Sequence, residues 1–112
     1  MNGRYETLVQ RLNQAILYGQ GVTNLALRRS IESRAAESGG RSPEQGSEVP
    51  AALTKYIEKV GQHAYEVTDA DVEALRQAGY SEDAIFEITV SAALGAAMGR
   101  LERGMAALKG GQ

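Results

Sequence analysis

The sequence has 112 residues, enough for one domain with a single hydrophobic core. Hydrophobic residues make up 43%, charged residues 23% and the net charge is −2, an ordinary soluble balance that excludes a strongly basic nucleic-acid-binding or membrane-surface protein. The chain has no cysteine, which excludes disulfides, thiolate metal sites and thiol redox chemistry by its own residues.

Apolar residues recur at three- and four-residue steps without strand-like alternation, which predicts an all-α fold of about five helices. We expect the first helix at residues 4–18 and the second at 23–37. Arg28, Arg29 and Arg34 in the second helix indicate a solvated face with intrahelical glutamate–arginine pairs, or alternatively an anion-binding face. Residues 38–48 are rich in glycine and polar side chains, and predict a flexible loop that is either a surface connector or a lid.

The third helix is expected to start at Pro50, because proline suits the first helical position, and to run to Tyr65. His63 is the only histidine in the chain and falls near the end of this helix. Its ring can interact with the helix dipole or make a buried hydrogen bond, and both are structural roles. The alternative is a catalytic or ligand-binding role.

Thr68 and Asp71 have the spacing of a helix-capping pair, which predicts the start of a fourth helix that Gly79 ends. Ser81 is the expected N-cap of a fifth helix over residues 82–109, about 42 Å long. From Ala84 to Gly99 this helix is apolar on more than one side, with many small residues that let a neighbouring helix approach closely. It is therefore expected to be buried, partly by another subunit.

The sequence contains no phosphate-binding loop, zinc-protease motif or serine-hydrolase motif, and one histidine cannot form a two-histidine metal site. We therefore expect no metal and no cofactor. His63, Glu87 and Arg100 are the candidate catalytic residues, because Glu87 and Arg100 bound the apolar run of the last helix. A structural hydrogen bond or ion pair is the alternative for Glu87. The candidate ligand-binding residues are Tyr56, Tyr65 and Tyr80, which could equally be core or interface residues.

The segment from Ala74 to Ile85 contains an Ala-Gly-x-Ser turn, and an alanine-rich helix follows it and ends in Gly-Arg-Leu. This pattern resembles the carboxymuconolactone decarboxylase and alkyl hydroperoxidase D-like group, over about residues 56–108. The resemblance implies a single helical domain over residues 1–112 that assembles into trimers or hexamers. It agrees with the separate expectation, drawn from the last helix, of a homo-oligomer.

The peroxidase branch of that group has a Cys-x-x-Cys-x-x-x-His motif just before this turn. The matching positions are about Tyr65, Thr68 and Val72, so both cysteines and the histidine are missing. Since a thiolate is indispensable for that reaction, thiol peroxidase activity is rejected. The decarboxylase branch does not need the cysteine pair, but His63 does not align with its histidine, and no catalytic residue carries over.

Three hypotheses remain open. The first is a cysteine-less, non-redox member of the group that forms an oligomer and binds a small molecule at a subunit interface. The second is a decarboxylase or isomerase acting on a small carboxylate through His63, Glu87 or Arg100. The third is a non-catalytic helical interaction protein. The N-terminus lacks a secretory signal pattern, and the longest uncharged run is shorter than the roughly 20 residues that span a bilayer, so a cytoplasmic protein with no membrane and no nucleic-acid partner is expected.

Overall fold

The computed structural model describes residues 3 to 110, which form five α-helices and one short 3₁₀ turn, with no strand among them. The α-helices are α1 (Gly3–Leu17), α2 (Leu25–Ser38), α3 (Ala51–Gln62), α4 (Asp69–Gln77) and α5 (Glu82–Gly110), and the 3₁₀ turn η1 (Ala64–Glu66) joins α3 to α4. The expected all-α class is therefore confirmed.

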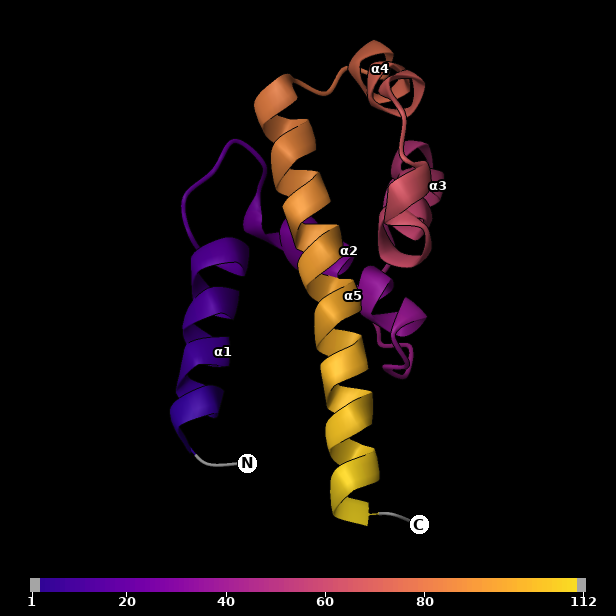
Figure 1. Ribbon diagram of the computed structural model, residues 1–112. Helices are drawn as coiled ribbons and strands as arrows, with labels where there is room; N and C mark the ends of the chain where they lie inside the picture. Colours follow the sequence, from indigo (N-terminus) through magenta and orange to yellow (C-terminus); the bar gives the residue numbers. More distant parts are fainter. Residues whose placement is uncertain (1–2, 111–112) are drawn as a thin grey trace.

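The long helix α5 is the axis of the molecule, and every other α-helix contacts it. Figure 1 shows α1 on one side of α5, α3 and α4 on the other, and α2 passing behind. The contact between α2 and α5 is the most extensive in the fold, whereas α1 contacts only α5 and α2. Much of the surface of α1 and one face of α5 therefore stay open.

The hydrophobic core lies between α2, α3, α4 and α5. Ile31 of α2, Leu53 and Ile57 of α3 and Ile88 of α5 are the large apolar side chains that are buried most completely. They come from faces with helical spacing, so the core follows the periodicity that predicted the helices. Burial of each such side chain stabilises the fold by roughly 1.5–3 kcal/mol relative to leaving it exposed.

Two glycines bring the backbones of α2 and α5 into direct contact. A Cβ atom added to Gly95 would lie 2.2 Å from the carbonyl oxygen of Glu32, and one added to Gly99 would lie 2.2 Å from that of Ala36. No side chain fits at either position without moving a helix. The small residues of the last helix predict such a close approach, and the neighbour is α2 of the same chain.

The caps predicted around α4 are confirmed. The Thr68 hydroxyl accepts from the Asp71 N–H, and the Asp71 carboxylate accepts from the Thr68 N–H at 2.8 Å, so the two residues form a capping box. Gly79 then takes a left-handed conformation (φ +106°), which favours glycine. The Ser81 hydroxyl accepts from the Ala84 N–H at 3.1 Å and starts α5. Local chemistry thus fixes the α4–α5 turn.

The third helix was predicted too long at both ends. Pro50 is the N-cap and precedes the first helical residue, and α3 ends at Gln62, where His63 has φ −142° and ψ 53°. At the C-terminal end, the Gly61 carbonyl accepts from Arg100 Nη2 at 2.7 Å. A side chain of α5 thus supplies a hydrogen bond that the next turn of helix would otherwise provide.

The loop after α2 is tied to the helices at its start. Ser38, predicted as the first loop residue, is the last residue of α2. Arg41 lies 2.8 Å from Glu32 of α2 and 2.6 Å from Glu102 of α5, so one guanidinium joins the loop to two helices. Its hydrogen bonds to Glu102 and then to Glu32 raise the pKa of Arg41 further above its ordinary value. The sequence does not predict this anchor.

By length and composition, α5 is the one described helix that could cross a membrane. Half of its most apolar window is buried against the rest of the chain, as is also found for the core helix of a soluble protein.

Candidate functional site

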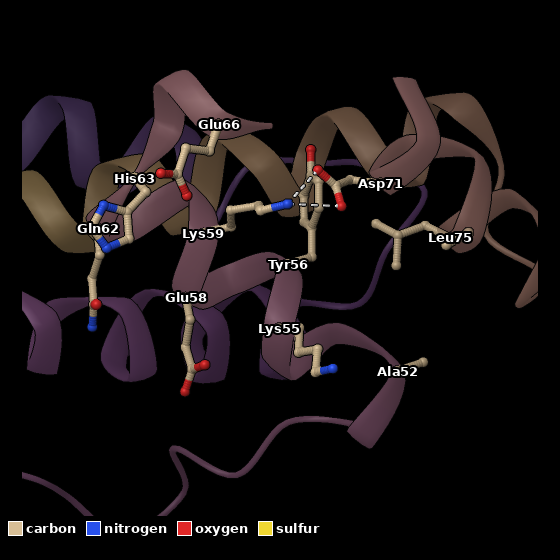
Figure 2. A pocket seen from close by; sticks show the side chains of 11 residues that line it. Ala52, Lys55, Tyr56, Glu58, Lys59, Gln62, His63, Glu66, Asp71 and Leu75 are labelled. Carbon is tan, nitrogen blue, oxygen red and sulfur yellow. Dashed lines mark hydrogen bonds and ion pairs between the residues drawn. The ribbon is translucent and has the colours of Figure 1, made fainter. Parts of the chain in front are cut away.

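A groove of about 440 Å³ lies between α3 and α4. Figure 2 shows the Lys59 side chain reaching across it toward Asp71. Lys59 Nζ lies 2.9 Å from one carboxylate oxygen of Asp71 and 3.1 Å from the other. The bond from Lys59, followed by the bond from the Thr68 N–H, lowers the pKa of Asp71 and keeps its carboxylate charged at neutral pH. The groove therefore holds a partly exposed ammonium–carboxylate pair.

The two ends of this groove differ in chemistry. Gln62, His63 and Glu66 line one end, whereas Ala52, Leu75 and the Lys55 side chain lie toward the other (Figure 2). The second end thus combines apolar surface with one ammonium group.

His63 lies on the surface at the polar end of the groove. The backbone N–H of His63 donates to the Lys59 carbonyl at 2.8 Å and closes the last turn of α3. Its ring meets the ring of Tyr65 edge-on, with centroids 6.0 Å apart. Tyr65 is 83% exposed, so this aromatic pair is open to solvent.

The other two candidate tyrosines face inward. Tyr56 is buried, and its hydroxyl lies 2.6 Å from the Thr89 hydroxyl of α5. Because the Thr89 hydroxyl donates to the Ile85 carbonyl at 2.7 Å, Tyr56 is the donor in this pair. Tyr80 packs against the core and does not line the groove. Tyr56 contributes its ring to the groove wall while its hydroxyl is already bonded.

Glu87 holds the connection between α1 and α2. Its carboxylate accepts from the N–H groups of Val22 and Thr23 at 2.8 and 2.9 Å, and from the Thr23 hydroxyl at 2.5 Å. Burial alone would raise the pKa of Glu87, but these bonds and the charge of Arg28 together lower it. Thr23, predicted as the first residue of the second helix, lies before α2, which begins at Leu25 with Asn24 as its N-cap.

Arg28 is buried, so the predicted solvated arginine face is wrong at this residue. Only 4% of Arg28 is exposed, and its guanidinium donates to the carbonyls of Ile16 at 2.9 Å and Thr23 at 3.3 Å. The guanidinium thus satisfies a carbonyl in the last turn of α1. Helical spacing could not reveal this role, because α1 reaches Arg28 only through the tertiary fold.

The three catalytic candidates do not form one cluster within the chain. The Arg100 side chain, from α5, donates to the Gly61 carbonyl two residues before His63, so Arg100 and His63 both lie near the C-terminal end of α3. Glu87 lies instead in a second hollow of about 250 Å³, beside α1 and Arg28. Their roles in catalysis stay predictions.

Of the residues that line the groove, the sequence predicts only Tyr56 and His63 as site residues, and it predicts neither Lys59 nor its pairing with Asp71. Asp71 does cap α4, and the same carboxylate also pairs with Lys59. The two residues lie in different helices with a turn between them, so no spacing rule connects them.

A second surface feature is an exposed apolar stripe along α5, which we call the α5 stripe. Phe86 is 68% exposed, Leu101 39% and Leu108 82%. Between them lie small or medium apolar residues at steps of three and four, all at least partly exposed, so the α5 stripe consists of Phe86, Val90, Ala93, Ala97, Leu101, Gly104 and Leu108. At 100° per residue these positions fall on one face of the helix.

Within residues 3–110, no group of three or more histidine, cysteine, aspartate or glutamate side chains converges as a metal site would require. Comparison of the chain with family models, with curated proteins and with solved structures gives no significant match.

Proposed function

We propose that the chain is a self-associating, non-redox helical protein of the carboxymuconolactone decarboxylase-like group, whose oligomer is the functional unit. The observation that carries this proposal is the α5 stripe. Phe86 and Leu108, near its two ends, expose most of their apolar surface. Transfer of such surface out of water is favourable by roughly 25 cal/mol per Å², and a contiguous exposed patch is typical of an interface.

The membership in this group rests on the turn between α4 and α5. The turn combines the positive φ of Gly79 with the N-cap at Ser81, and a long helix follows it, which is the order of elements that the resemblance implies. The non-redox part rests on composition, since the chain has no cysteine to act as a thiolate.

Light scattering of the natural chain over a range of concentrations tests this proposal. The expected molar mass is that of two or more chains. A molar mass equal to one chain at every concentration would refute the proposal. A mass equal to three or six chains would in addition match the assemblies implied by the resemblance.

The groove between α3 and α4 supports a second candidate function, the binding or turnover of a small carboxylate. Two lysines, Lys55 and Lys59, and the only histidine line the groove, together with three carboxylates, Glu58, Glu66 and Asp71. A small carboxylate would take the place of the Asp71 carboxylate on the Lys59 ammonium, with its apolar body against Leu75.

Because His63 is the only histidine, its ring protons give isolated NMR signals that report on the groove directly. Benzoate and succinate serve as aromatic and aliphatic probes. Either probe should shift the His63 signals in a saturable way in the natural chain and in Lys55→Met, and the shift should be lost in Lys59→Met. If neither probe shifts these signals at millimolar concentration, the groove does not bind small carboxylates.

A further inference from the structure

We infer that two copies of the chain pair antiparallel through the α5 stripe, around a two-fold axis that passes through Ala97. The inference rests on the proposed self-association and adds the partner surface, the direction and the register. Ala97 is exposed and lies at the middle of the stripe.

The order of residues along the stripe is symmetric about Ala97. Phe86 lies eleven residues before Ala97 and Leu108 eleven after it, while Val90 lies seven before and Gly104 seven after. In an antiparallel pair with this axis, each position therefore faces its counterpart from the other copy. The contact would extend over about 33 Å, from Phe86 to Leu108.

The paired positions complement each other in size. Ala93 faces Leu101, and Val90 faces Gly104, so a larger side chain meets a smaller one at each of these steps. A Cβ added to Gly104 meets nothing within 4 Å in its own chain, so the space beside Gly104 is free for a side chain of the partner. A parallel pair would instead place Leu101 on Leu101 and Gly104 on Gly104, which leaves overlap at one level and a gap at the next.

The charges at the helix ends favour the same direction. The first turn of α5 carries Asp83 and Glu82, of which Glu82 is paired with Arg76 of α4, and its last turn carries Lys109. Antiparallel pairing brings the acidic end of one helix beside the basic end of the other, and it also opposes the two helix dipoles. A parallel pair would put like charges together at both ends.

Single cysteines test the register cleanly, because the natural chain contains none. The molar mass of each variant is first measured by light scattering under reducing conditions. The variants are then oxidised separately, and they are Ala93→Cys, Ala97→Cys, Leu101→Cys and Gly104→Cys. A disulfide needs Cα atoms within about 7 Å. Cysteines at 104 would lie about 21 Å apart along the axis, and those at 93 or at 101 about 12 Å apart, whereas cysteines at 97 face each other.

Ala97→Cys should therefore form a covalent dimer at least about tenfold faster than Gly104→Cys, because facing thiols have a high effective concentration. Ala93→Cys and Leu101→Cys should cross-link when mixed and much less when each is alone. Equal cross-linking at all four positions would overturn the antiparallel register.

The failure of this inference can be told apart from the failure of self-association. Reduced variants that are oligomers but do not cross-link at position 97, or that have the mass of three chains, which a two-fold pair cannot build, would overturn the register and leave self-association standing. If the natural chain and all four variants are monomers, both the register and the proposed self-association are overturned. Flotation of the natural chain with anionic phospholipid vesicles, without cross-linking at position 97, would assign the stripe to a membrane surface and also overturn the inference.

Discussion

Replacement of Gly95 or Gly99 by alanine should destabilise the fold, because the new methyl group has no room between α2 and α5. In each case the added carbon would lie 2.2 Å from a backbone carbonyl oxygen of α2. Carbon–oxygen contacts in proteins are seldom closer than about 3.3 Å, so the two helices must separate by about 1 Å. A backbone oxygen inside a helix cannot turn away as a flexible side chain can.

Two opposing effects set the size of this change. Overpacking of a well-packed contact costs about 3 kcal/mol at the upper end of the usual range. Alanine favours a helix over glycine by about 1 kcal/mol. The free energy of unfolding should therefore fall by about 2 kcal/mol for each substitution, which lowers the melting temperature by about 10 °C in a domain of this size.

Urea and thermal unfolding followed by circular dichroism measure this loss. Gly104→Ala is the matched control when all variants are compared at a concentration where the chain is monomeric, because it lies in the same helix and its added carbon meets nothing within 4 Å in its own chain. It should gain about 0.5–1 kcal/mol from helix propensity alone. If Gly95→Ala and Gly99→Ala are as stable as the natural chain or gain stability as Gly104→Ala does, the direct backbone contact is refuted.

Two further predictions follow from the caps and from Glu87. Thr68→Ala should lower the free energy of unfolding by about 1 kcal/mol in urea titrations, since it removes the N-cap of α4, whereas Thr68→Ser should lose much less. Folding lowers the pKa of Glu87, so its contribution to stability is complete above the unfolded pKa and is lost as the pH falls through the folded value. The stability difference between the natural chain and Glu87→Gln should therefore be largest near pH 7 and shrink as the pH falls through and below the ordinary pKa of 4.5; a difference that does not change with pH would contradict the role of the charged carboxylate.

The features that could be predicted from the sequence are those decided by neighbouring residues. The Thr68 cap, the Gly79 stop and the Ser81 start each depend on side chains and backbone within one helical turn, and the structure contains all three. The apolar spacing of α3 likewise predicted its buried face, because helical geometry alone decides which residues share a side.

The features that could not be predicted depend on contacts between distant parts of the chain. Arg28 is charged and lies in the most basic segment, yet it is buried because α1 offers it a carbonyl. The last turn of α3 is bonded by Arg100, which is 39 residues away from the Gly61 carbonyl that accepts from it. The groove was missed for the same reason, since Lys59 and Asp71 meet only after α3 and α4 have folded against each other.

The central claim is that the α5 stripe is the surface through which the chain self-associates, and sedimentation velocity of Ala97→Glu tests it most directly. Two glutamates would face each other on the proposed axis, where their like charges oppose pairing. Ala106→Glu is the control, because Ala106 is also exposed on α5 but lies nine residues further on, half a turn around the helix. The natural chain and Ala106→Glu should sediment as oligomers and Ala97→Glu as a folded monomer. If Ala97→Glu has the same sedimentation coefficient as the natural chain, the stripe is not the interface.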